Sequence, residues 1–295
     1  MVLTLKCIKD RLLVIFNKSA SDERRGSMLD YCIDRPAMQP IRIITESIKV
    51  AKWLALYYGR YFKPNNAIPK MTIEISEINN DKYEITYNNE TIITNSFIKD
   101  FSDLLREITV CDSNAFVLHG ASIEYHNEAY VFLAPSTGGK TTLTSYLCER
   151  KFGYITDDFT IIDKESLSII PINKPIHLRL KSLFLLNNTY NFKIKTYNLD
   201  DGFTKRFIYQ PNNICVESIP IRSIYFLKRN NEINKISKVP NVEKSIYLLK
   251  SLMFSKNVTS DILSINKLSK YPCYILEYSD LGFVEKLILE EGDRT

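Results

Sequence analysis

Glycine and histidine are scarce in this sequence, with 9 and 3 copies among 295 residues. The six cysteines lie far apart and form no CxxC pair, so the ligand spacing of a zinc site is missing. No apolar run approaches the roughly 20 residues that cross a bilayer. Lys6 and Asp10 interrupt the start too early for the apolar region of a secretory signal. These absences predict a cytoplasmic protein with reduced thiols and no membrane partner.

Positive charge is not gathered into runs. The 39 basic residues are scattered among 34 acidic ones, which gives a net charge of +5 and a pI of about 8.7. The basic stripe of a nucleic-acid-binding protein is therefore missing, and we expect no nucleic-acid partner. Solvated surface charges explain this balance most simply, although a protein that handles phosphates would show the same balance.

Neither internal repeats nor low-complexity tracts divide the chain. Its hydrophobic patterns predict an α/β protein of mixed α+β character in two parts, residues 1–110 and 111–295. The first part is expected to be a small α+β module, because turn residues separate its short strands. Its expected elements are a helix at 47–61, strands at 70–78, 82–88 and 91–94 with turns at 79–81 and 88–89, and an amphipathic helix at 97–109.

The second part is expected to form a mixed central sheet with helices packed around it. A turn at His126 and Asn127 separates two of its strands. The expected strands are 116–118, 122–125, 128–133, 154–155, 159–162, 223–227 and 272–278, and the expected helices are 140–150, 242–254 and 281–289.

A phosphate-binding loop is the strongest motif. Gly139, Lys140 and Thr141 match the end of the pattern G-x-x-x-x-G-K-[ST], between an apolar strand and a helix-forming segment. Glycines allow successive backbone N–H groups to face a phosphate, and the helix N-terminus adds its positive dipole end. The lysine can reach the β- and γ-phosphates, and the threonine hydroxyl can ligate Mg²⁺. The candidate nucleotide-binding residues are Ser136, Thr137, Gly138, Gly139, Lys140, Thr141 and Thr142.

Two adjacent acids, Asp157 and Asp158, follow Lys140 after 17 residues. That distance accommodates one helix of about three turns and a tight loop before the next strand. Acids beside a phosphate loop can divide two tasks, holding Mg²⁺ and accepting the proton of an attacking hydroxyl. His119 follows a short apolar strand, a position that by itself is more typical of a structural histidine.

The segment from 119 to 163 resembles the HPr serine kinase family, whose nucleotide-binding core is shared with phosphoenolpyruvate carboxykinases. The resemblance lies in the step His119-Gly120 after a strand, the strand–loop–helix at 130–146, and the glycine–aromatic turn that leads to the paired aspartates at 153–159. It implies a P-loop core on a mixed sheet and an ATP- and Mg²⁺-dependent serine kinase.

Carried over to this sequence, the resemblance implies that Lys140 and Thr141 bind phosphate and metal and that His119 lies near the transferred phosphoryl group. Of the acid pair, it implies a base and a metal ligand. We expect Asp157 to be the base and Asp158 to face the metal. The family also tends to assemble, which leaves a homo-oligomer open.

The chain departs from the family pattern at three places. Ala134 and Thr137 replace glycines of the family loop, and the arginine- and glycine-rich stretch near the protein substrate has no clear equivalent. The nearest candidate is 171–181, where Arg179 could contact phosphate or substrate. In this respect the chain is similar to divergent relatives found beside peptide-modification genes, some of which phosphorylate a serine of a ribosomal peptide precursor such as a lasso peptide. Other distant relatives phosphorylate free serine.

Several functions stay open at this level. The favoured acceptor is a serine of a peptide or protein, with free serine or another small hydroxyl compound as an alternative. A nucleotide-binding regulator without phosphotransfer would also suit the Ala134 departure, although such a protein could lose one acid of the pair. A carboxykinase-type enzyme fits less well, because three histidines leave no additional metal site. Residues 1–110 are expected to recognise the substrate or to make oligomer contacts.

Overall fold

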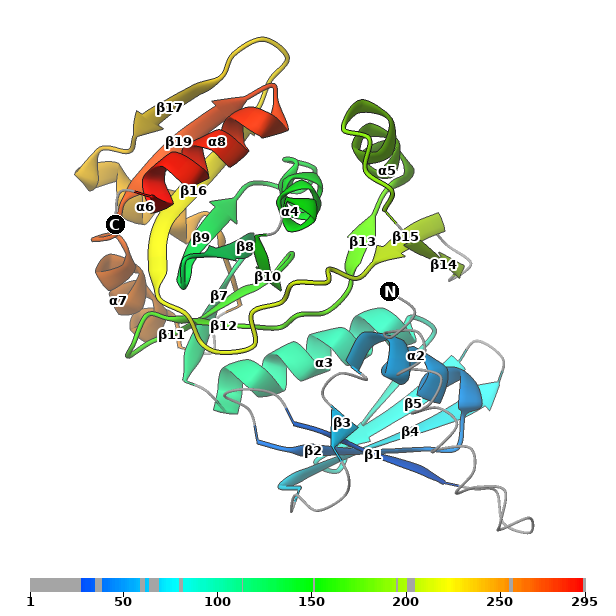
Figure 1. The fold of residues 1–295 in the computed structure, drawn as a ribbon. Helices are drawn as coiled ribbons and strands as arrows, with labels where there is room; N and C mark the ends of the chain where they lie inside the picture. The colour runs from blue at the N-terminus through cyan, green and yellow to red at the C-terminus, as the bar shows by residue number, and fades with distance from the viewer. Residues whose placement is uncertain are drawn as a thin grey trace. The chain divides into compact units, whose positions relative to one another are not determined.

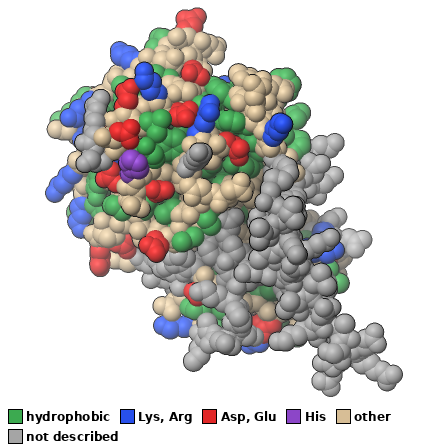
Figure 2. Space-filling view, viewed as in Figure 1, with side chains coloured by type: hydrophobic (Ala, Val, Ile, Leu, Met, Phe, Trp, Pro, Cys, Tyr) green, Lys and Arg blue, Asp and Glu red, His purple; other side chains and the backbone are tan. Residues whose placement is uncertain are grey.

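The computed structural model describes residues 28–34, 39–58, 62–63, 69–79, 82–112, 114–150, 152–194, 196–200, 205–254 and 257–293. The chain divides into two compact units, Met1–Asp112 and Ser113–Thr295 (Figure 1). Across the described ranges, no helix combines the length and the apolar character needed to cross a membrane. Acidic and basic side chains are interspersed on the face shown in Figure 2. The cysteines of the described residues, Cys32, Cys111, Cys148, Cys215 and Cys273, are free thiols.

In its described residues, the first unit is a six-stranded sheet with the helices α2 (Ile48–Tyr58) and α3 (Phe97–Asp112) on one face (Figure 1). Trp53 lies at the centre of an aromatic cluster with Tyr57, Tyr58, Phe97 and Phe101, which joins the two helices. In sheet order the strands are β3 (Phe62–Lys63), β1 (Leu29–Ile33), β2 (Ile41–Thr45), β4 (Met71–Asn79), β5 (Lys82–Tyr87) and β6 (Glu90–Thr94).

The predicted meander of this unit is confirmed as β4, β5 and β6, and its turn at Asn88 and Asn89 has left-handed backbone angles. The strands β1 and β2 were not predicted. The predicted helix at 47–61 ends at Tyr58, and residues 59–61 lie outside the described part of the chain. Residues 80–81 of the predicted turn at 79–81 also lie outside it, while Asn79 ends β4.

The second unit is built on a six-stranded mixed sheet, as predicted. Three strands run parallel, because β16 pairs in parallel with both β9 and β19, whereas the outer pairs are antiparallel. In sheet order the strands are β10 (Gly153–Thr156), β8 (Gly120–Tyr125), β9 (Glu128–Leu133), β16 (Ile221–Arg229), β19 (Cys273–Tyr278) and β17 (Lys235–Lys238).

Both faces of this sheet are buried at its strand β9. Tyr130 and Phe132 of β9 pack in one core cluster, while Val131 and Leu133 pack in another. This alternation follows from the two-residue period of a strand, and it makes β9 a continuous apolar run. Helices α4 (Lys140–Glu149) and α8 (Leu281–Gly292) cover the first face, and α6 (Asn241–Leu249) and α7 (Val258–Leu268) contribute to the core on the second.

Two smaller sheets complete the second unit. The first has the strand order β12 (Ile169–Ile170), β11 (Thr160–Asp163), β7 (Ala115–Leu118) and β18 (Leu252–Phe254). The second has the order β13 (Ile176–Leu178), β15 (Lys205–Tyr209) and β14 (Thr196–Asp200). Between β13 and β14 the chain forms a short α-helix, α5 (Leu180–Phe184), followed by a π-helical turn, η2 (Leu185–Thr189).

The prediction of one helix at 242–254 is wrong at its C-terminal end. The helix stops at Leu249, and Leu252 pairs with Leu118 as part of β18. The carbonyl of Ser251 also accepts the backbone N–H of His119 at 2.7 Å. Pairing with a distant strand therefore overrides the local helix pattern of these residues. Helix α7 was not predicted, although the Asn257 side chain caps it by accepting the N–H of Ser260.

Candidate functional site

The predicted phosphate loop connects β9 to α4 at the carboxyl end of the parallel strands, where ligands bind in open α/β sheets. Gly139 is the N-cap of α4 and has a φ of 93°, which an L side chain rarely adopts. A Cβ at this position would also lie 2.6 Å from the Tyr278 hydroxyl. Glycine is therefore required at 139 for both backbone angle and space.

Ala134, the departure from the usual first glycine, is accommodated by the loop. It is not among the described residues with a positive φ, so its methyl group causes no backbone strain. A Cβ on Gly138 would lie 2.6 Å from the Ala134 Cβ and 3.0 Å from the Pro135 carbonyl oxygen. Gly138 thus leaves the space that the Ala134 methyl group occupies.

Thr137, the second departure, is a strained position. Its φ is 68°, in the left-handed region that β-branched residues avoid. Backbone strain of this kind costs on the order of 1–3 kcal/mol and is often found at ligand sites. The loop therefore retains a glycine-like shape at 137 without the glycine that would form it most easily.

Lys140 is buried, with 5% of its surface exposed, and its ammonium is held by the site. Nζ donates to the carbonyl oxygens of Ala134 at 2.7 Å and Pro135 at 3.3 Å, and it lies 3.0 Å from Nε2 of His119. Burial lowers the pKa of Lys140, while Asp158 and Asp157 oppose this effect. The Lys140 ammonium thus lies against the backbone carbonyls at the start of the loop, directly after the end of β9.

His119 precedes β8, the strand next to β9, which explains how it reaches Lys140. Its Nδ1 lies 3.2 Å from the backbone carbonyl oxygen of Asp158. A carbonyl only accepts hydrogen bonds, so Nδ1 carries the proton and Nε2 accepts from Lys140. Burial, followed by the Lys140 charge, lowers the pKa of His119, in agreement with a neutral ring.

The two acids differ in their surroundings. Asp157 is 3% exposed and accepts the Thr141 hydroxyl at 3.0 and 3.2 Å to its two carboxylate oxygens. Burial, and then the charge of Asp158, raise the pKa of Asp157 well above its usual value, against the effects of Lys174, Thr141 and Lys140. Asp158 is only partly buried, has a φ of 71° and lines the cavity described next.

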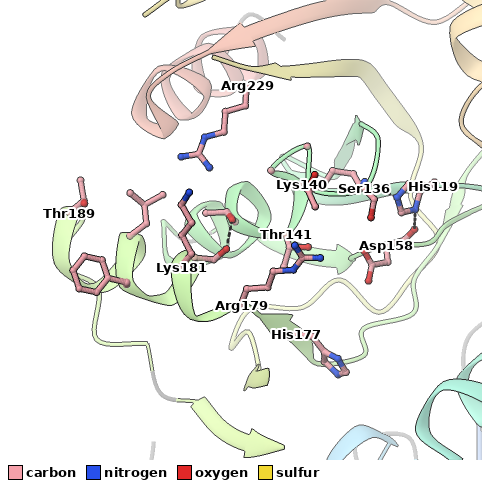
Figure 3. A pocket seen from close by; sticks show the side chains of 17 residues that line it. His119, Ser136, Lys140, Thr141, Asp158, His177, Arg179, Lys181, Thr189 and Arg229 are labelled. Atoms are coloured by element: carbon pink, nitrogen blue, oxygen red, sulfur yellow. Dashed lines mark hydrogen bonds between the residues drawn. The ribbon is translucent and has the colours of Figure 1, made fainter. Parts of the chain in front are cut away.

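A cavity of about 530 Å³ lies over the loop (Figure 3). This volume falls within the usual range for small-molecule sites, roughly 300–1,000 Å³. All the predicted site residues line the cavity except Asp157. The Asp157 carboxylate instead accepts the hydroxyl of Thr141, which does line the cavity. The predicted residues on its wall are His119, Ser136, Thr137, Gly138, Gly139, Lys140, Thr141, Thr142, Asp158 and Arg179.

The cavity wall also includes residues that sequence reasoning did not select. Three of them can carry positive charge: His177 on β13, Lys181 on α5 and Arg229 at the end of β16. The remaining residues are Ser182 and Phe184 of α5 and Leu185 and Thr189 of η2. Ser182 is joined to the loop, because its hydroxyl lies 2.8 Å from that of Thr142.

Little in the sequence could have identified these additions. Arg229 lies two residues beyond the predicted strand 223–227, whereas His177 and Lys181 fall in the candidate stretch 171–181, where no pattern distinguished them from their neighbours. Helix α5 has only five residues, too few for a hydrophobic period to be recognised. The positive character of the wall is clear from the structure, since Asp158 is the one acidic side chain among its described residues.

Oxygen donors that suit Mg²⁺ occur at one point of the site. Thr141 and Asp157 share a hydrogen bond, and the buried Asp157 carboxylate would be stabilised by a cation. The described residues contain no cluster of three or more His, Cys, Asp or Glu side chains able to hold a metal. Mg²⁺ is commonly held by one or two carboxylates together with water and substrate phosphates.

The sequence matches no protein-family model and no curated protein.

Proposed function

We propose that this chain is an ATP-dependent kinase that transfers the γ-phosphoryl group of ATP to a serine hydroxyl of a peptide or protein, on an HPr kinase-like P-loop core. One observation carries the proposal: Lys140, Thr141, Asp158 and His119 surround one cavity at the end of β9. The fold assignment is supported by the adjacency of β8, β9 and β10, which bring the histidine, the loop and the acid pair together.

The loop binds the phosphates of the nucleotide. Backbone N–H groups at the start of α4 face the cavity end of the loop, and the helix dipole favours an anion there. Lys140 exchanges the carbonyls of Ala134 and Pro135 for phosphate oxygens, which are stronger partners because both groups are charged. His119 then retains one N–H bond of the lysine and directs its ammonium.

Thr141 and Asp157 would hold Mg²⁺, and Asp158 serves as the base. This assignment reverses the one expected from the sequence, because Asp157 is buried against Thr141 whereas Asp158 lines the cavity. When held there, Mg²⁺ would neutralise negative charge on the phosphates. Burial, followed by the charge of Asp158, raises the pKa of Asp157, and a bound cation would lower it.

The transfer requires one bond to form and one to break. The acceptor oxygen bonds to the γ-phosphorus, and the bond from this phosphorus to the bridging oxygen breaks, with its electron pair leaving on ADP. The proton of the acceptor hydroxyl passes to the Asp158 carboxylate. Lys140 stabilises the negative charge that develops on the bridging oxygen.

A nucleotide-binding regulator without phosphotransfer is the second candidate. It is favoured by the bonding of Lys140, whose ammonium contacts the carbonyl oxygens of Ala134 and Pro135 and Nε2 of His119. The strained Thr137 in the loop is also compatible with such a function. The two candidates differ in whether ATP is consumed.

The experiment offers γ-labelled ATP and Mg²⁺ to the full chain together with candidate acceptors: free serine, an HPr-like protein and serine-containing peptides. Lys140→Ala and Asp158→Asn are the site variants. Lys286→Ala is the matched control, because the Lys286 side chain is 77% exposed and pairs with Glu290, another surface residue of α8. Label in one acceptor, retained by the control and lost in both site variants, supports the kinase. Binding of ATP without label in any acceptor supports the regulator.

A further inference from the structure

The cavity has two chemically different ends. His119 and Asp158 lie at one end, and Thr189 lies at the other, with Lys181 and Arg229 between them (Figure 3). Phe184 and Leu185 line the cavity from α5 and η2, the elements that carry Lys181 and Thr189. The cavity is therefore polar and acid-containing where the acceptor would react and partly apolar at its far end.

Phe184 is an aromatic residue without an evident structural role. Its side chain is 65% exposed, and it belongs to neither core cluster of the second unit. Among the described residues, no aromatic ring stacks on it. An exposed aromatic ring on the wall of a cavity can stack on a flat ligand, because a planar heterocycle buries its surface there at little cost in conformational freedom.

The direction of the nucleotide follows from the proposed function. A γ-phosphate near Asp158 places the rest of the phosphate chain around the start of α4, where Thr142 contacts Ser182 of α5. Arg229 lies beside the same turn, because its Cδ would be 3.7 Å from a Cβ on Gly139. The nucleoside must then leave the loop toward α5 and η2, away from the acceptor.

We infer that the α5–η2 end of the cavity is the nucleoside subsite, in which the base of the nucleotide stacks on Phe184 and packs against Leu185. Lys181 and Arg229, both exposed and without an ion pair in the described part of the chain, face the α- and β-phosphates. This inference rests on the proposed function, since the orientation of the phosphates sets which end receives the base.

The test compares two ligands that differ only in having a nucleoside. Calorimetric titration of the full chain measures the affinity for ATP and for inorganic tripolyphosphate, each with Mg²⁺. Phe184→Ala should weaken ATP binding about tenfold, the size expected for loss of one base–aromatic stack. It should leave tripolyphosphate binding unchanged, and Phe184→Trp should restore ATP binding.

Leu180→Ala is the matched control. Leu180 is on the same helix and is also 65% exposed, but it does not line the cavity. It should bind both ligands as the parent chain does. Because both residues are exposed, neither substitution should lower the thermal unfolding midpoint, which is measured in parallel.

Each outcome decides between the claims. Equal loss of both ligands in Phe184→Ala, or no loss of either, overturns the nucleoside subsite while the phosphate loop stands. If Phe184→Ala changes only the KM for the acceptor, by raising it, this result also overturns the nucleoside subsite and assigns Phe184 to acceptor binding. If the parent chain binds neither ATP nor tripolyphosphate, or if Lys140→Ala binds both normally, the proposed function fails together with the inference.

Discussion

Nζ of Lys140 lies 3.0 Å from Nε2 of His119, and this pairing requires a neutral imidazole protonated on Nδ1. The two residues are 21 positions apart in sequence, yet they meet because β8 and β9 are neighbouring strands. The side chain of His119 thereby contacts Lys140 of the predicted phosphate loop, although His119 precedes a different strand, β8.

This pairing predicts a pH-dependent stability. The pKa of His119 is lowered in the folded chain, so the unfolded state binds more protons as pH falls below about 6.5. The free energy of unfolding should therefore decrease from pH 7 toward the folded-state pKa. Denaturant titrations at several pH values should show a smaller decrease in His119→Asn. An identical pH profile in the two proteins would contradict the pairing.

Thr137→Gly should stabilise the protein by about 1 kcal/mol, because relief of left-handed strain exceeds the added freedom of glycine in the unfolded chain. Ser136→Gly is the control, since Ser136 is in the same loop without a positive φ. It should destabilise by about 0.5 kcal/mol. Equal effects of the two substitutions on the urea midpoint would show that Thr137 is not strained.

Gly138→Ala should distort the loop and lower its affinity for tripolyphosphate, because the new methyl group would lie 2.6 Å from the Ala134 Cβ. Ala134→Gly in the same chain should recover part of the loss, with the contact to the Pro135 carbonyl remaining. A double-mutant cycle on tripolyphosphate affinity measures the coupling, which should be favourable and larger than about 0.5 kcal/mol. Additive effects would mean that the two residues do not share this space.

Tyr278→Phe should leave stability unchanged or raise it by about 1 kcal/mol, because its hydroxyl is buried without a hydrogen-bond partner among the described residues. Burial raises the pKa of Tyr278 to about 12, so the hydroxyl is neutral. Tyr209→Phe is the contrast: Tyr209 is equally buried but donates to Glu149 at 2.6 Å. That change should cost about 1–2 kcal/mol in thermal or urea unfolding. A larger loss for Tyr278→Phe would reveal a partner of its hydroxyl.

The parts of the site that lie on one continuous segment could be predicted from sequence. Strand β9, the loop and α4 follow from an apolar run, glycines and a helix-forming stretch, and the predicted strand 128–133 has the observed bounds. The acid pair follows at a distance set by one helix. Local pattern is sufficient here because the segment folds back on itself.

The remaining wall of the cavity depends on tertiary packing. Arg229 reaches the loop because β16 inserts beside β9 in the sheet, and no local pattern specifies that strand order. Phe184 is on a helix of five residues, which has no detectable period. Likewise, the roles of Asp157 and Asp158 could not be separated in sequence, because burial of one and exposure of the other to the cavity are properties of the fold.

The most direct test of the central claim follows both ends of ATP in one reaction. Parallel incubations use α-labelled and γ-labelled ATP with Mg²⁺ and an acceptor that the full chain phosphorylates. We expect that only the γ label enters the acceptor, that the α label remains in ADP, and that Asp158→Asn slows transfer about 10²–10⁴-fold while still binding ATP. Label transfer that persists unchanged in Lys140→Ala or Asp158→Asn, or a chain that does not bind ATP, would contradict the claim.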